Sequence, residues 1–172
     1  GMSYSTNRDD LSQKVQDSSN ETKIFSYEPW VNKNFAVKNR QDLSQVKEVF
    51  EKKLGGLSAI RFGAEYWYGY NPGTYKNGDS SYAFDLKDNY AAAFAESDVY
   101  VTNELALKLG ARYEYSSIIK KANIAPRVSL AYKVGEGAQV SLAYGTFYEK
   151  PLNTELIYNT SLNYTKATHY IA

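Results

Sequence analysis

Apolar and polar side chains alternate along this chain in segments of about twelve to fourteen residues. A strand of an ordinary globular protein has about five or six residues, and a tilted strand that crosses a membrane needs about nine to eleven. In residues 57–70, one face is apolar and aromatic, while the other carries Arg61, Glu65 and two glycines. Because alternate side chains of a strand point to opposite faces, this pattern predicts overlong strands with one apolar face.

The same alternation occurs in five further segments: residues 42–54, 90–102, 105–117, 123–134 and 138–150. A shorter run of the same kind occupies residues 167–172. Residues 42–54 also place apolar side chains at helical spacing. They lead directly into Gly55-Gly56, however, and a glycine pair followed by strong alternation is a hairpin signal that favours a strand.

The connections between these segments are expected to alternate in length. Short turns are predicted at Gly55-Gly56, Asn103-Glu104 and residues 135–137, and longer loops at residues 71–88 and 150–163. The link at residues 116–123 is intermediate. With up-and-down topology, the tight turns would lie on one rim and the longer loops on the other, as in outer-membrane barrels.

These features predict an all-β fold, an antiparallel up-and-down meander that forms a partial or small closed β-barrel with long strands. Residues 1–41 are predicted to form a polar loop region with one short strand inside residues 22–30, and residues 42–172 to form the barrel strands. No apolar run reaches the roughly 18 residues that a spanning helix needs. The polar N-terminus also lacks the apolar stretch of a signal peptide.

Tyrosine dominates the aromatic residues, with 17 Tyr against 7 Phe and 2 Trp. A ring that carries a hydroxyl suits the boundary between apolar and aqueous surroundings. Tyrosines gather toward the loop-side ends of the apolar faces, at Tyr66, Tyr68, Tyr70, Tyr113, Tyr115, Tyr144 and Tyr148. This distribution resembles a girdle at a membrane interface.

The ionisable side chains exclude several classes of function. With 20 basic and 19 acidic residues, the chain has no electrostatic attraction to nucleic acid. The absence of cysteine excludes disulfides, thiolate metal sites and cysteine nucleophiles.

Charged residues collect on the face opposite the apolar one. They are Arg61, Glu65, Glu96, Asp98, Lys108, Arg112, Glu114, Arg127, Lys133 and Glu149. One interpretation is a polar lumen whose charges steer a substrate. The other, which the general behaviour of charged ladders favours, is a set of ion pairs that pack against neighbouring strands or a plug.

Within this face, Glu96 and Asp98 lie two residues apart, as a carboxylate pair for acid–base chemistry or calcium binding would. No nucleophile or oxyanion donor accompanies them, and the oxygen-rich spacing of a calcium loop is missing. His169 is the single histidine, and one imidazole without partners does not hold a metal. We therefore predict no catalytic, cofactor-binding or metal-binding residue, no cofactor, and a protein that is not an enzyme.

The two predicted long loops are the expected place of ligand contact, because loops commonly carry specificity. Their large side chains are Tyr75, Tyr82, Phe84, Leu152, Ile157 and Tyr158. The glycines Gly63, Gly69, Gly110 and Gly145 match no phosphate-binding spacing and are expected to allow close packing or a bend in a strand.

Two features of the sequence concern the edges of the predicted sheet. Pro126 lacks an N–H group, so we expect it at an edge or near a rim, where the ladder needs no donor. If the strands belong to a larger sheet, the two terminal strands expose unpaired edges. The isolated chain is then expected to associate with itself through those edges.

The chain contains the phrases EKKLGGLSAIRFGAEY, ESDVYVTNELALKLGARYEYSS, ANIAPRVSLAYKVGEG and VSLAYGTFYEKPLN, with LNYTKATHYI after them. As strand–turn–strand units they resemble consecutive barrel strands in the C-terminal half of TonB-dependent receptors from Bacteroidetes-type bacteria. The resemblance covers roughly residues 42–172.

This resemblance implies a 22-stranded outer-membrane barrel closed by an N-terminal plug domain. Such receptors import siderophores, haem, cobalamin or glycans with energy from the TonB complex. The sequence shows no plug and no TonB-contact segment, and it has room for only seven or eight strands. We therefore expect a receptor fragment whose parent contacts a nutrient ligand, outer-membrane lipid and, through its plug, the TonB complex.

A soluble β-barrel that binds a small hydrophobic ligand is the alternative. In such a barrel the same apolar faces would point inward around the ligand, and the charged faces would meet water. The two hypotheses therefore differ in which face of the strands is exposed.

Overall fold

A computed structural model describes residues 1–23, 33–78 and 80–172 of the chain. It contains eight strands, namely β1 (Met2–Gln13), β2 (Phe35–Gly55), β3 (Ser58–Asn77), β4 (Ser80–Tyr100), β5 (Leu105–Ser116), β6 (Lys121–Gly135), β7 (Ala138–Glu149) and β8 (Thr165–Ile171). One helical turn, α1 (Asn153–Leu156), lies between β7 and β8. The predicted all-β fold is confirmed.

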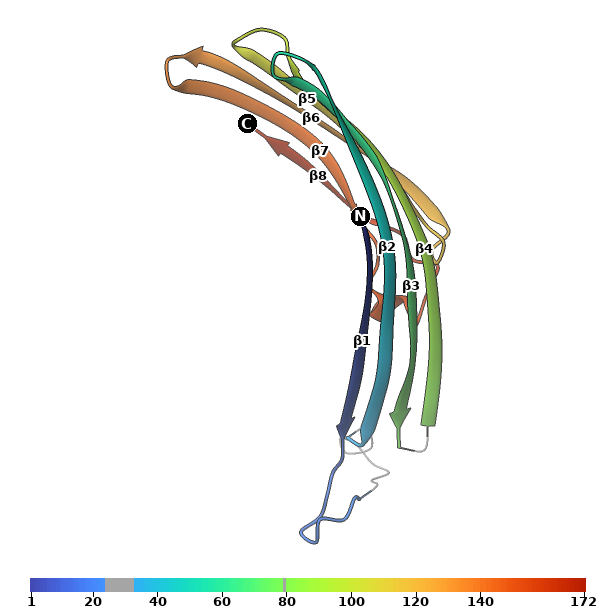
Figure 1. Cartoon of the computed structure of the whole chain (residues 1–172). Helices are drawn as coiled ribbons and strands as arrows, with labels where there is room; N and C mark the ends of the chain where they lie inside the picture. The colour runs from blue at the N-terminus through green and yellow to red at the C-terminus, as the bar shows by residue number, and fades with distance from the viewer. Residues whose placement is uncertain (24–32, 79) are drawn as a thin grey trace. The chain divides into compact units, whose positions relative to one another are not determined.

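The strands are hydrogen-bonded in chain order, from β1 to β8, in a single antiparallel sheet. In the described part of the chain no hydrogen bonds join β8 to β1, so the sheet is an open meander rather than a small closed barrel. Figure 1 shows β5, β6, β7 and β8 side by side in this order. No helix among the described residues is long and apolar enough to cross a membrane.

The residues divide into two compact units. Unit 1 comprises Gly1–Met2, Gln45–Trp67 and Asn89–Ala172, and unit 2 comprises Ser3–Ser44 and Tyr68–Asp88. The long strands β2, β3 and β4 each contribute residues to both units.

The register of unit 1 aligns the apolar side chains of neighbouring strands. Val99 pairs with Leu107, Leu107 with Leu130, and Leu130 with Leu142. A second row passes through Ser97, Leu109, Val128, Tyr144 and Tyr170. We call this side of β4 to β8 the apolar face. Because side chains alternate along each strand, the residues between these positions form the opposite, polar face.

Large side chains of the apolar face are exposed, whereas some side chains of the polar face are buried. On the apolar face Leu109 is 42% exposed and Leu142 is 51% exposed. On the polar face Ser116 is fully buried and Tyr90 is 8% exposed. A soluble barrel built around a hydrophobic ligand requires the reverse arrangement, with the apolar face inside. The apolar face is thus not buried in the interior of unit 1, and no helix lies among the described residues between 57 and 149.

The predicted long loop at residues 71–88 is wrong. Strand β3 continues to Asn77 and β4 begins at Ser80, so the Pro72-Gly73 pair lies inside a strand. The actual turn contains Gly78, which has a positive φ of 57°. Inside unit 2, the ring of Phe84 occupies the space that a side chain at position 73 would need. Cross-strand packing therefore extends the ladder through a sequence that signals a turn.

The predicted loop character of residues 1–41 is wrong for residues 2–13 and 35–41, whereas residues 14–23 do form a loop. Residues Met2–Gln13 form β1, and β2 begins at Phe35. Neither face of β1 is apolar, so the sequence shows no alternation there, and the strand exists because β2 supplies its hydrogen-bonding partner. The short strand expected inside residues 22–30 lies almost wholly outside the described residues.

The tight turns of unit 1 agree with the sequence. β2 and β3 are joined at Gly56-Leu57, with positive φ at Gly55 and Gly56, and β6 and β7 at Glu136-Gly137. β4 and β5 are joined by residues 101–104, where the N–H of Val101 donates to the carbonyl of Leu105. The connection of residues 117–120 is equally short, whereas residues 150–164 form the predicted long loop.

Candidate functional site: the polar face of unit 1

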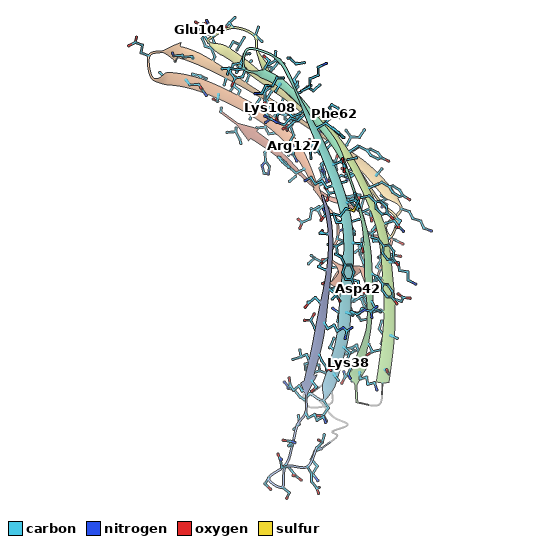
Figure 2. The ribbon with its side chains drawn as sticks, in the orientation of Figure 1. Lys38, Asp42, Phe62, Glu104, Lys108 and Arg127 are labelled. Carbon is cyan, nitrogen blue, oxygen red and sulfur yellow. The ribbon has the colours of Figure 1, made fainter. Side chains whose placement is uncertain are left out.

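The polar face of unit 1 carries nearly all the charged residues that the sequence singled out. Alternation along the strands places these residues on one side, with Arg61 and Glu65 on β3, Glu96 and Asp98 on β4, Lys108, Arg112 and Glu114 on β5, and Arg127 on β6. Figure 2 labels Lys108 and Arg127 of this face, and Phe62 of the opposite face.

Arg61 is the centre of a first ion-pair cluster. Its guanidinium lies 2.6 Å from a carboxylate oxygen of Glu51, 2.8 Å from one of Asp98 and 3.4 Å from one of Glu96. Lys108 approaches the same two β4 carboxylates at 3.5 and 3.8 Å. The cluster joins β2, β3, β4 and β5, and its three carboxylates outnumber its two cations.

Arg112 is the centre of a second, less exposed cluster. Its guanidinium donates to Glu114 at 2.6 Å, to Glu65 at 3.2 Å and to the Tyr90 hydroxyl at 3.2 Å. The Gln45 amide donates to Glu65 at 2.7 Å. The carboxylate side chains of Glu65 and Glu114 are only 13% exposed, against 45% for Glu51 of the first cluster. Desolvated carboxylates need these donors, because burial of an unpaired charge is costly.

The structure therefore brings together seven of the ten predicted charged residues in two clusters. Glu96 and Asp98 do lie close together, but both accept ion pairs from Arg61 and Lys108. Within residues 1–23, 33–78 and 80–172, Lys133 and Glu149 form no ion pair. Arg127 stacks on an aromatic ring instead of pairing with a carboxylate, with its Cζ 4.7 Å from the ring centre of Phe147.

An aromatic group completes the polar face near the second cluster. Trp67 of β3 stacks on Tyr90 of β4 at a centroid distance of 4.7 Å and an interplanar angle of 17°. The ammonium of Lys150, which follows β7, lies 4.7 Å from the centre of the Trp67 ring. The sequence pattern does not reveal this group, because alternation marks Trp67 and Tyr90 only as strand positions and leaves Lys150 at the junction of a predicted strand and a predicted loop.

The contact between Lys150 and Trp67 constrains the form of unit 1. Three strands separate β3 from β7, so a flat sheet would place them about 19 Å apart. That separation is far beyond the reach of a lysine side chain. The sheet of unit 1 therefore curves with its polar face inside, and the start of the 150–164 loop reaches across that face.

The 150–164 loop is ordered by its own hydrogen bonds. The Leu152 N–H donates to the Glu155 carboxylate at 3.0 Å, and the Leu156 N–H donates to the Leu152 carbonyl at 3.0 Å. Leu156 is 1% exposed and Tyr164 is 9% exposed. Of the large side chains in this loop, where ligand contact is expected, Tyr158 is 85% exposed and Leu152 is 63% exposed.

In unit 2 the large side chains of the predicted loop at residues 71–88 lie on strands instead. Phe84 packs against Gly73 and lines an open hollow of about 480 Å³, together with Asp9 and Asn39. Tyr75 stacks on Phe35 at 6.5 Å, and Tyr82 is exposed. The ring of Tyr70 has the Arg40 guanidinium 5.5 Å and the Lys87 ammonium 5.3 Å from its centre.

The beginning of the loop between β1 and β2 is built around Asp17. Its carboxylate accepts hydrogen bonds from the N–H groups of Ser19 and Glu21 at 2.9 and 3.0 Å, and the ammonium of Lys23 lies 3.0 Å away. The Lys23 ammonium, followed by the Glu21 N–H, holds the pKa of Asp17 below its ordinary value.

No group of three or more His, Cys, Asp or Glu side chains suited to a metal ion occurs among the described residues. His169 lies on β8, opposite Gly145 of β7, with its ring 5.0 Å from that of Phe147. The polar face therefore offers cation–carboxylate pairs and aromatic stacking, which suit binding and the lining of a channel.

Comparison with known proteins agrees with an open sheet that has an exposed apolar face and a charged opposite face. The chain matches the family described as TonB dependent receptor-like, beta-barrel over residues 1–170. No curated protein and no solved structure matches it. Proteins of this family are receptors of the outer membrane that act as transporters rather than enzymes. Because the match covers nearly the whole sequence, the chain belongs to the TonB-dependent receptor-like β-barrel family.

Proposed function

We propose that this chain forms part of the wall of an outer-membrane barrel whose apolar face contacts lipid and whose polar face borders an aqueous interior. The observation that carries the proposal is the exposed apolar face. Its rows include Leu107, Leu130 and Leu142, and no charged side chain interrupts them between β4 and β7. A face of this kind is expensive in water and favourable in hydrocarbon.

Strand lengths support the same arrangement. β5, β6 and β7 have 12, 15 and 12 residues, against the nine to eleven that a tilted strand needs to cross a bilayer. β2 and β4 have 21 residues each and would extend about 70 Å, which is well over the roughly 42 Å of a strand crossing at 45°. We therefore expect only part of β2 and of β4 to lie within the hydrocarbon.

We expect tyrosines on the apolar side of β3, β5 and β7 to meet the membrane interface. Tyr66, Tyr113, Tyr115 and Tyr144 are all more than a third exposed. Tyr68 and Tyr70 belong to unit 2, so a single girdle that joins all of these tyrosines stays a prediction.

The cargo that we propose for the parent receptor is one of the nutrients that the resemblance implies: a siderophore, haem, cobalamin or a glycan. The two ion-pair clusters would then line the route of the cargo and keep the wall rigid. The described residues form the sheet and its connections, so we assign the contact with the TonB complex to a plug domain outside these residues. The resemblance to the C-terminal half of a Bacteroidetes-type barrel belongs to this proposal.

A pair of adjacent residues on β6 tests which face meets lipid. The chain has no cysteine, so Val128→Cys and Ser129→Cys can each carry a single nitroxide label. In lipid vesicles, the label at position 128 should relax faster with oxygen dissolved in the bilayer, and the label at position 129 with a water-soluble nickel chelate. A label at position 128 that oxygen does not relax faster, with the label at position 129 still accessible to the nickel chelate, would support the soluble ligand-binding barrel and contradict the membrane wall.

The open edges lead to a proposal about the isolated chain. β1 and β8 each pair with only one neighbour, and every residue of β8 is exposed. We expect the chain in detergent to associate through these edges, because unpaired strand edges recruit further strands. Light scattering coupled to size exclusion should give more than one chain per particle, and a strictly monomeric particle would refute this expectation.

A further inference from the structure

One row across the polar face places an arginine between two glycines. The register aligns Glu96, Gly110, Arg127, Gly145 and His169 on five consecutive strands, β4 to β8. Because neither glycine has a side chain, the ring of Phe147 can lie over Gly145, and the Glu96 side chain can lie close to Gly110. These residues, together with Lys108 and Phe147, line a hollow of about 290 Å³.

Arg127 differs from the other arginines of this face in its partners. Arg61 has three carboxylates within ion-pair distance, and Arg112 has two. In the described part of the chain, Arg127 has none. Its guanidinium lies over the ring of Phe147, which packs against Gly145 and is 5.0 Å from the ring of His169.

This stacking fixes the plane of the guanidinium but leaves its N–H groups available. An arginine held on an aromatic face presents its planar fork of donors to a carboxylate without losing much side-chain freedom on binding. His169 offers a further ring nitrogen. It lies on β8, which pairs with β7 on the side of Gly145 opposite to Arg127. The Arg127 guanidinium and the His169 imidazole together provide the hydrogen-bond donors of an anion site.

We propose that this hollow, which we call the Arg127 site, binds the carboxylate group of a small ligand through Arg127 and His169. Its volume fits an organic acid, or the acidic end of a larger ligand. A singly charged carboxylate is favoured over a doubly charged phosphate, because the adjacent Arg61 cluster holds three carboxylates against two cations. The inference rests on the proposed function only in that the polar face must be open to water.

The test uses the protein that carries this chain, purified in detergent, with its histidines labelled with carbon-13. The His169 ring resonance, identified by its loss in His169→Gln, is followed during titration with sodium acetate. Sodium chloride and sodium phosphate at the same ionic strength serve as parallel titrations. Acetate should shift the resonance saturably, and phosphate should do so at higher concentration or not at all.

Two variants separate the Arg127 site from general charge effects. Arg127→Gln should raise the acetate midpoint at least tenfold, whereas Lys133→Gln, which removes a cation from the same strand and face, should leave it within twofold. Gly110→Ala should also weaken binding, because the added methyl group would lie 3.2 Å from the Glu96 Cβ and narrow the hollow without altering Arg127. A circular dichroism spectrum of each variant confirms that it is folded.

Three outcomes would overturn the proposal. The acetate midpoint could be the same in Arg127→Gln as in the wild type, or chloride could shift the His169 resonance with the same midpoint as acetate. In the third outcome, phosphate would saturate the shift at a lower concentration than acetate. The nitroxide labels at positions 128 and 129 report the orientation of the wall independently. If the label at position 128 shows no contact with lipid while the label at position 129 stays accessible to water and acetate still binds, the membrane wall is refuted and the Arg127 site stands.

Discussion

The ammonium nitrogen of Lys150 lies 4.7 Å from the centre of the Trp67 indole ring, which joins the loop after β7 to strand β3 across the polar face. A cation over an indole face contributes about 0.5–1 kcal/mol where it is partly solvated. This contact and the Trp67–Tyr90 stack hold the beginning of the 150–164 loop over the inside of the curved sheet.

Removal of this cation should change the surroundings of Trp67. In a background where Trp30, the other tryptophan, is replaced by phenylalanine, we expect Lys150→Gln to shift the fluorescence of Trp67 and to increase its quenching by acrylamide. Lys150→Arg should retain the wild-type spectrum, because arginine also stacks on indole rings. Lys166→Gln is the control, and an effect as large as that of Lys150→Gln would contradict the contact.

A charge on the apolar face should destabilise the membrane-inserted protein. Leu109→Arg is expected to cost about 2–4 kcal/mol if the residue lies near the bilayer midplane. Ser129→Arg, at a similar level but on the polar face, should cost less than about 1 kcal/mol, as is usual for surface substitutions. Reversible urea unfolding in lipid vesicles measures both, and equal values would show that residue 109 does not meet lipid.

The two ion-pair clusters should differ in their contribution to stability. Arg112→Met removes the donor from two largely buried carboxylates and should cost about 1–3 kcal/mol. Arg61→Met should cost about 1 kcal/mol or less, because the carboxylates of its cluster are more exposed.

A double substitution checks that the cost for Arg112 arises from unpaired charge. Adding Glu65→Gln to Arg112→Met should recover part of the lost free energy of unfolding, because one buried carboxylate no longer lacks its cation. Strictly additive destabilisation in the same unfolding assay would argue against this explanation.

Gly63 lies where β2 and β4 leave no space for a side chain. A methyl group there would press against the Glu48 carbonyl and lie 2.8 Å from a ring carbon of Phe94. Gly63→Ala should therefore destabilise the sheet by about 1–3 kcal/mol. Gly135→Ala adds the same methyl group in open space and should change the free energy of unfolding by less than about 0.5 kcal/mol.

The turn around Asp17 should loosen in acid. The folded pKa of Asp17 is lowered, so its ionised form is favoured by the folded turn. The resulting order is fully present above the ordinary carboxyl pKa of 3.8 and is lost as the pH falls through the lowered value. Amide exchange at Ser19 and Glu21 should accelerate, relative to the intrinsic rate, over that interval. Asp17→Asn should abolish this pH dependence, and its persistence would exclude Asp17 as the cause.

The strand pattern of residues 57–70 and 90–150 was predictable from the sequence, because a period of two over more than ten residues has few structural alternatives. The tight turns of unit 1 follow from glycine pairs and from the short polar link after Tyr100. The sequence also assigned the charged residues to one face. It did so because strand geometry alone decides which side chains share a side.

Residues 71–88 show where local signals fail. Pro72-Gly73 and the polar residues around it predict a loop, but β3 and β4 continue through them, with Phe84 packed against Gly73. β1 was likewise missed, because a strand that is polar on both faces has no alternation and depends on its hydrogen-bonding partner for its existence.

The sequence alone determined most of the strand residues of unit 1, their two chemically distinct faces and the family that the chain resembles, because these properties depend on side-chain order along one segment. Only the tertiary structure decided which cations have carboxylate partners, that Lys150 reaches Trp67, and that Arg127 stands between two glycines. Those relationships depend on the register between strands and on the curvature of the sheet. Neither the register nor the curvature can be read from the sequence of a single segment.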